Sequence, residues 1–90
     1  MKKQVHVYYI GTVQGVGFRF TAVSVANDLG IGGWVRNLDS GKVEVVAEAE
    51  EDTLKNFLAE INRIFSRYIH DVDINWLDAT DRFKDFGVKF

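Results

Sequence analysis

A cluster of glycines followed by one arginine is the feature of this chain most suggestive of chemistry. Gly11, Gly15 and Gly17 fall within seven residues, and Arg19 follows two positions later. Glycine allows several backbone amides to turn to one side without a Cβ in the way. Such amides beside a helix N-terminus bind anions, and a guanidinium presents a planar fork to two phosphate oxygens. The pattern therefore predicts an anion site suited to phosphate.

The position of Arg19 within its element supports this interpretation. From Phe18 onward the apolar residues recur at helical spacing, which places Arg19 in the first turn of a helix. A cation is unfavourable there because of the helix dipole, and an anion held between the two offsets that cost. The alternative is that the glycines only make a tight connection and that Arg19 is a solvated surface charge. The spacing matches neither the nucleoside-triphosphate loop nor the dinucleotide fingerprint.

Asn37 is the second candidate, near the end of the second predicted strand. Its side chain offers one acceptor and two donors without a charge, so it can hold a water molecule close to an anion in the glycine loop. The alternative is an asparagine before a turn that bonds its own backbone.

The elements that must position these residues follow from periodicity and turn chemistry. Alternating or β-branched runs predict strands at 4–10, 31–38, 42–49, 69–79 and 84–90, with helices from Phe18 to Gly30 and from Glu50 onward. This order predicts an α+β, ferredoxin-like β-α-β-β-α-β two-layer sandwich, an antiparallel sheet with two helices on one face and a short fifth strand whose position stays open. Right-handed crossovers make the first two strands parallel with the third between them. The glycine loop and Asn37 then share one end of the sheet, roughly 10 Å apart.

Length and composition limit the remaining possibilities. Ninety residues, 47% hydrophobic and 27% charged, predict a single globular domain over 1–90 and exclude disorder. A net charge of −2 gives no basic excess for nucleic-acid binding. The absence of cysteine excludes disulfides, thiolate nucleophiles and cysteine metal sites. No run approaches the roughly 20 apolar residues of a membrane span, so we expect a cytoplasmic protein without membrane attachment.

With these residues in view, the sequence resembles the acylphosphatase family. The family's first signature is complete over 11–19, as Gly-Thr-Val-Gln-Gly-Val-Gly-Phe-Arg, and its second is complete over 33–37, as Gly-Trp-Val-Arg-Asn, continued by Gly-Lys-Val at 41–43. The resemblance covers almost the whole chain. Two departures lie away from these signatures: Ala49 replaces a usual glycine, and residues 62–67 lack a Gly-Pro pair found in many members.

The resemblance implies an activity and a site. Acylphosphatases hydrolyse the carboxyl–phosphate anhydride of acyl phosphates, without a metal or an organic cofactor. The resemblance assigns orientation of the attacking water to Asn37, and phosphate binding to Arg19 and to the backbone of Gln14, Gly15, Val16, Gly17 and Phe18. The implied partners are a small acyl phosphate and inorganic phosphate, as product and inhibitor. We expect a monomer that binds no nucleic acid.

Other functions stay open at this point. A ferredoxin-like domain can be a non-catalytic binding module, or a domain that acts on carbamoyl phosphate within a larger maturation protein. RNA binding on the sheet is disfavoured by the acidic balance and by the missing aromatic-rich basic strand motif. His70 with two nearby acids suggests a solvated face rather than a metal site. We expect the larger aromatic side chains to be core: Trp34, Phe57, Phe65, Trp76 and Phe86.

Overall fold

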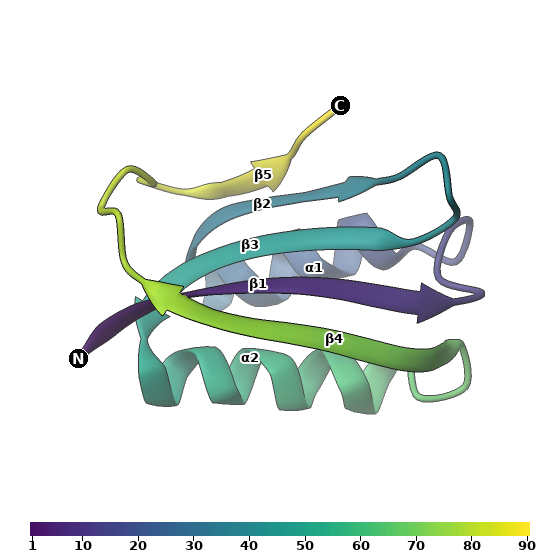
Figure 1. Ribbon diagram of the computed structural model, residues 1–90, viewed down its shortest axis with the longest axis horizontal. Coiled ribbons are helices and arrows are strands. Elements are labelled where there is room, and N and C mark those ends of the chain that lie inside the picture. Colours follow the sequence, from purple (N-terminus) through teal and green to yellow (C-terminus); the bar gives the residue numbers. More distant parts are fainter.

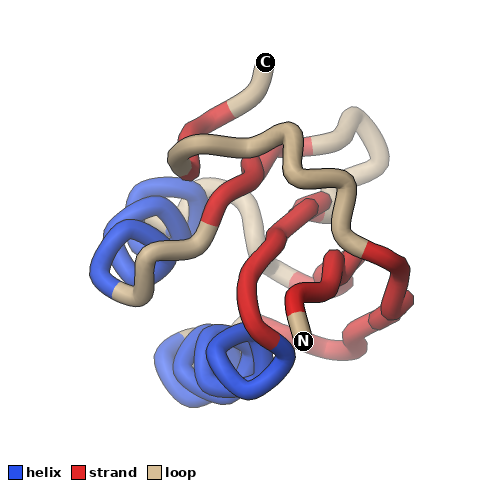
Figure 2. Tube along the Cα trace, turned by 90° about the vertical axis from the view of Figure 1, so that its left-hand side faces the viewer, coloured by secondary structure: helices blue, strands red, loops and turns tan.

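The computed structural model describes residues 1–90 as one five-stranded sheet with two helices on a single face (Figure 1). The elements are β1 (Lys2–Gly11), α1 (Phe18–Asp28), β2 (Gly32–Asn37), β3 (Val43–Glu50), α2 (Glu51–Ile64), β4 (Ile69–Asp78) and β5 (Phe86–Val88). The strand order is β4-β1-β3-β2-β5, with β3 antiparallel to both β1 and β2. The ferredoxin-like prediction is therefore confirmed, and Figure 2 shows both helices on the same side of the strands.

The fifth strand is where the structure differs from the sequence prediction. β5 covers only Phe86–Val88 rather than 84–90, and it pairs in parallel with β2. The sheet is thus mixed rather than wholly antiparallel. The reason is the connection over 79–85, which crosses from the end of β4 to the opposite edge of the sheet and enters β5 in the direction of β2 (Figure 1).

The core lies between the sheet and the helices. Val5, Val7 and Tyr9 alternate along β1 and are fully buried, as expected for strand residues that face one layer of helices. Glu51 and Asp52 occupy the first turn of α2, where the dipole favours negative charge. The same helix contributes four buried apolar side chains to the core: Leu54, Phe57, Leu58 and Ile61. Neither helix combines the length and the apolar character that crossing a bilayer requires.

The prediction that the large aromatics are core is only partly correct. Phe57, Phe65 and Phe86 are buried, but Trp34 is half-buried and Trp76 is 41% exposed. Trp34 alternates with the core residue Val35 and therefore lies on the open face of the sheet, and Trp76 lies on the edge strand β4.

The open face carries a polar network. Glu44 is buried there between Nε2 of His6 and Nε of Arg36, each 2.6 Å from one of its carboxylate oxygens. Burial by itself would raise the pKa of Glu44, but the hydrogen bonds from His6 and Arg36 outweigh it and hold the pKa below its ordinary value.

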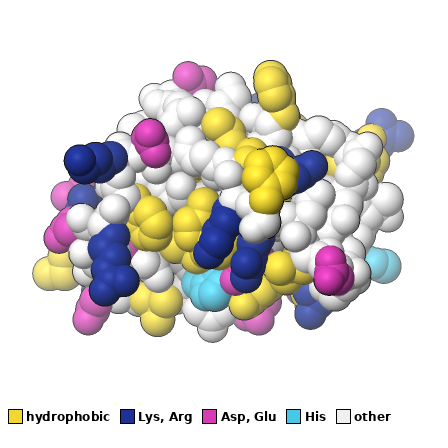
Figure 3. All heavy atoms as spheres, turned by 90° about the horizontal axis from the view of Figure 1, so that it is seen from above, with side chains coloured by type: hydrophobic (Ala, Val, Ile, Leu, Met, Phe, Trp, Pro, Cys, Tyr) yellow, Lys and Arg dark blue, Asp and Glu magenta, His cyan; other side chains and the backbone are white.

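On the side seen in Figure 3, basic, acidic and hydrophobic side chains are interspersed, without a continuous basic surface. No group of three His, Asp or Glu side chains in the chain is arranged to hold a metal ion.

Candidate active site

The loop between β1 and α1 owes its shape to two glycines. Gly15 and Gly17 both have a φ of +79°, whereas Val16 between them does not have a positive φ. Alternation of this kind turns successive amides toward one side, as in anion-binding nests. A Cβ added at Gly15 or Gly17 would meet no atom within 4 Å. The glycines are therefore needed for their backbone conformation and not, as the sequence suggests, because space is short.

The backbone amides of this loop are free to bind a ligand. From Gly15 to Phe20, no amide donates a hydrogen bond to a protein acceptor, and the first bonded one is Thr21, which donates to the carbonyl of Gly17 at 3.0 Å. The N-cap residue of α1 is Gly17, which has no side chain to cap the helix, and the first turn has no acidic residue. Unsatisfied amides and the positive end of the helix dipole thus meet at the start of α1.

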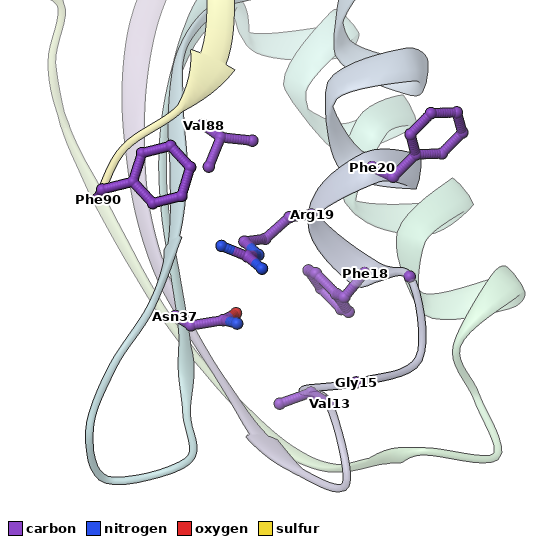
Figure 4. A pocket seen from close by; sticks show the side chains of 9 residues that line it. Val13, Gly15, Phe18, Arg19, Phe20, Asn37, Val88 and Phe90 are labelled. Atoms are coloured by element: carbon purple, nitrogen blue, oxygen red, sulfur yellow. The ribbon is translucent and has the colours of Figure 1, made fainter.

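Arg19 adds a full positive charge to these amides. Its guanidinium forms no ion pair with any carboxylate, in contrast to that of Arg36, which is bound to Glu44 on the other face of the sheet. Figure 4 shows the Arg19 side chain extending from α1 into the space in front of Asn37. The dipole cost of a cation in the first turn is therefore not relieved by any protein group.

Asn37 faces the same space from β2. It lies on the helix-facing side of the sheet, in register with Val43 of β3, which is in turn opposite Tyr9 of β1. The oxygen Oδ1 of Asn37 is buried and accepts no hydrogen bond from the protein. A buried acceptor without a donor is costly, so this oxygen is available to a water molecule or a ligand.

The alternative for Asn37, a bond to its own turn, is not seen. The turn is closed instead by Leu38, whose amide donates to the carbonyl of Lys42 at 2.9 Å, and by Gly41, whose amide donates to the carbonyl of Leu38 at 3.0 Å. The Asn37 side chain is left available to the pocket.

These groups line one pocket of about 370 Å³ (Figure 4). No acidic side chain lines it. The lining residues are Val13, Gly15, Gly17, Phe18, Arg19, Phe20, Asn37, Val88 and Phe90. The structure thus brings Arg19, Asn37 and the glycine loop together, as the sequence predicts.

Gln14 and Val16 differ from the other predicted loop residues, because neither lines the pocket. The side-chain amide Nε2 of Gln14 donates to the carbonyl oxygens of Leu38 at 2.7 Å and Lys42 at 2.9 Å, so it ties the glycine loop to the β2–β3 turn. Val16 is half-buried and packs against the core. Both side chains hold the loop in place.

Phe18 anchors the start of α1 to the hydrophobic core. Its ring is buried, with centroids 4.9 Å from the ring of Tyr9 and 4.6 Å from that of Phe65. Burial raises the pKa of Tyr9, so its hydroxyl stays neutral beneath the site. The first turn of α1 is thereby held against the sheet at the end where Asn37 lies.

Four lining residues are not among the predicted site residues: Val13 and Phe20 beside the glycine loop, and Val88 and Phe90 far from it in sequence. Val88 and Phe90 come from the end of the chain, and they reach the pocket because β5 pairs beside β2. No local pattern reveals that pairing, because a three-residue edge strand has neither a hairpin turn nor a long periodic run to place it.

Comparison with known proteins agrees with this geometry. The family model described as Acylphosphatase matches residues 5–88. An acylphosphatase of Caldanaerobacter subterraneus subsp. tengcongensis is 39% identical over 89 residues, covering 98% of this chain and 99% of that protein. One of Methylococcus capsulatus is 40% identical over 88 residues, covering 96% and 95%. The crystal structure of acylphosphatase from Bacillus subtilis matches with a TM-score of 0.88 and 27% identity, covering all of both chains. The chain belongs to the acylphosphatase family of hydrolases.

Proposed function

We propose that this chain hydrolyses acyl phosphates to a carboxylate and inorganic phosphate, with Arg19 and the loop amides holding the phosphate and Asn37 orienting the water. The observation that carries the proposal is the convergence of an unpaired guanidinium, unbonded helix-start amides and an unpartnered amide oxygen on one pocket without acidic residues.

Phosphate binding is supported by the positive charge of the pocket. The amides from Gly15 to Phe20 donate to no protein acceptor, and the guanidinium of Arg19 can form two parallel hydrogen bonds to phosphate oxygens. Phosphoryl transfer depends mainly on positioning and on stabilising charge on the equatorial oxygens. Both kinds of donor serve that purpose without any proton transfer of their own.

Water positioning is supported by Asn37. Its Oδ1 needs a donor, and a water molecule held there lies beside the phosphate that Arg19 binds. In the reaction, the water oxygen forms a bond to phosphorus as the bond from phosphorus to the acyl oxygen breaks. The electron pair of the broken bond leaves with the carboxylate. Asn37 is not a base, so the proton of the water passes to a phosphate oxygen of the substrate.

No protein acid is needed for the leaving group. The departing carboxylic acid has a pKa of about 4–5 in water, as Asp and Glu do, so it leaves as an anion near neutral pH. This explains why a pocket with one arginine and one asparagine as its polar side chains is sufficient for this reaction.

The test is hydrolysis of acetyl phosphate and benzoyl phosphate by the purified protein in EDTA, with Arg19→Gln as the variant. We expect turnover that survives EDTA in the wild type and is lost in Arg19→Gln, together with weaker inhibition by inorganic phosphate. Loss of the wild-type activity in EDTA would contradict metal independence. Unchanged phosphate inhibition in Arg19→Gln would contradict the assigned contact. A folded wild type that hydrolyses neither substrate would favour a non-catalytic binding module.

A further inference from the structure

The pocket extends beyond the groups that suit a phosphate. Arg19, Asn37 and the loop amides form its polar part, and Val88 and Phe90 form an apolar wall beside them (Figure 4). Phe90 is 98% exposed, which makes it the most exposed aromatic side chain of the protein. An apolar ring that packs against almost nothing, at the edge of a charged pocket, is available to a ligand.

Two features place Phe90 beside the polar part of the pocket. The amide of Lys89 donates to the carbonyl of Val35 at 2.9 Å, which continues the β5 pairing toward Asn37, two residues farther along β2. The guanidinium carbon of Arg19 lies 5.9 Å from the centroid of the Phe90 ring, within the range of a cation–π contact. In Figure 4 the Phe90 ring faces the pocket, whereas the ring of Phe20 points away from Arg19.

We infer that Val88 and Phe90 form a subsite for the acyl group of the substrate and give the enzyme a preference for aromatic over small aliphatic acyl phosphates. The inference rests on the proposed function, because it requires the phosphate to bind at Arg19. An acyl group attached to that phosphate lies within the same pocket, where Phe90 supplies the aromatic surface. A benzoyl ring can stack on Phe90 and cover Val88, while an acetyl group is too small to cover both.

The subsite makes Phe90 a specificity-determining residue, and substrate preference is its proper measure. Removing the ring has a second effect, the loss of its contact with Arg19. That effect acts on every acyl phosphate equally and also on inhibition by inorganic phosphate. The ratio of kcat/KM for benzoyl phosphate to kcat/KM for acetyl phosphate cancels it, and comparison of this ratio between variants cancels the intrinsic reactivity of the two substrates.

The experiment measures this ratio in the wild type and in three variants. Phe90→Ala removes the aromatic surface, and we expect the ratio to fall about five- to tenfold, the size typical of a lost aromatic contact. Phe90→Tyr keeps the ring and is expected to keep the ratio within about twofold, since its added hydroxyl can point to solvent. Trp76→Ala is the control, because it removes an aromatic side chain of β4 that is 41% exposed and does not line this pocket.

The outcomes separate the two proposals. An unchanged ratio in Phe90→Ala, or an equal fall in Trp76→Ala, overturns the acyl subsite while hydrolysis by the wild type leaves the proposed function intact. A fall in the ratio as large in Phe90→Tyr as in Phe90→Ala also overturns the subsite, since Phe90→Tyr retains the stacking surface. A wild type that hydrolyses neither substrate overturns the proposed function and the subsite together.

Discussion

The side-chain amide of Gln14 lies 2.7 Å from the carbonyl oxygen of Leu38, the residue that follows Asn37. This bond and its companion to Lys42 join the loop that carries the free amides to the turn that follows Asn37. The glycine loop follows β1 and Asn37 ends β2, so Gln14 directly links the two parts of the site. Their relative position therefore depends on a side chain that touches neither the phosphate nor the water in the proposed mechanism.

Gln14→Ala removes this link, and we expect kcat to fall roughly tenfold because a small misplacement of the water relative to the phosphate is costly. KM and phosphate inhibition should change less, since Arg19 and the amides remain. Steady-state kinetics well below the unfolding temperature measure kcat, KM and phosphate inhibition separately. Gln4→Ala is the control, because it removes a side-chain amide from the opposite face, where Gln4 bonds Glu48. Equal losses of kcat in both variants contradict a positioning role for Gln14.

Asn37→Ala removes the proposed water ligand, and we expect kcat to fall about 10²-fold or more, equivalent to about 3 kcal/mol, as for loss of a well-placed polar group in other active sites. Substrate affinity and inhibition by inorganic phosphate should change little. Single-turnover and steady-state rates with benzoyl phosphate measure the effect. A near-normal kcat is incompatible with water positioning by Asn37.

Gly17→Ala tests the backbone requirement of the loop. At a φ of +79° an alanine is strained by roughly 1–2 kcal/mol even though its Cβ has open space. Gly17→Asn should cost less, because asparagine tolerates the left-handed region. Urea unfolding measures both. Gly30→Ala is the matched control, because Gly30 has a φ of +70° and open space but lies at the other end of α1. We expect similar destabilisation from both alanines and loss of activity in Gly17→Ala alone.

The buried carboxylates predict a loss of stability in acid. Burial alone would raise the pKa of Glu48, but hydrogen bonds from Thr80, Gln4 and the Asp81 amide together lower it below 4.5, and the pKa of Glu44 is lowered as well. A carboxyl whose pKa is lower in the folded state contributes stability above its unfolded pKa. That contribution is lost as pH falls below 4.5 and through the folded value.

We therefore expect the free energy of unfolding to decrease as pH falls below 4.5, apart from the effects of exposed groups. Urea unfolding across this range measures the slope. The matched comparison is Glu44→Gln, which lacks one of the two carboxyls and should lose stability less steeply with falling pH. A slope equal to that of the wild type contradicts the assignment to Glu44.

The parts of this protein that local pattern determines are predictable, and the rest depends on contacts between distant segments. The helix start at Phe18 follows from apolar periodicity, and the strand predicted over 31–38 ends one residue beyond the observed end of β2 at Asn37. Both place Arg19 and Asn37 at one end of the sheet. The catalytic roles assigned to these two residues stay predictions. The prediction for Trp34 is wrong because hydrophobic character does not reveal which face of a strand a residue occupies near the sheet edge.

Gln14 and Phe90 show the same limit within the site. The side-chain bonds of Gln14 run to residues 24 and 28 positions away. Phe90 lies near Arg19 only because the connection over 79–85 carries the chain to the far edge of the sheet, where the three-residue strand β5 pairs with β2. Neither contact leaves a sequence pattern, because each depends on tertiary packing rather than on local propensity.

The short parallel edge strand has a consequence for how the protein opens. β5 has three residues and is flanked by the bonds of Gly33 to Asp85 and of Lys89 to Val35. An exposed edge element of this kind detaches locally at much lower free energy than the central strands, so its amides should exchange with solvent well before those of β3. Detachment would carry Phe90 away while Arg19 and Asn37 stay on α1 and β2. In the proposed mechanism, phosphate recognition therefore depends on the cooperative core, whereas the choice of acyl group depends on an edge element that can detach alone.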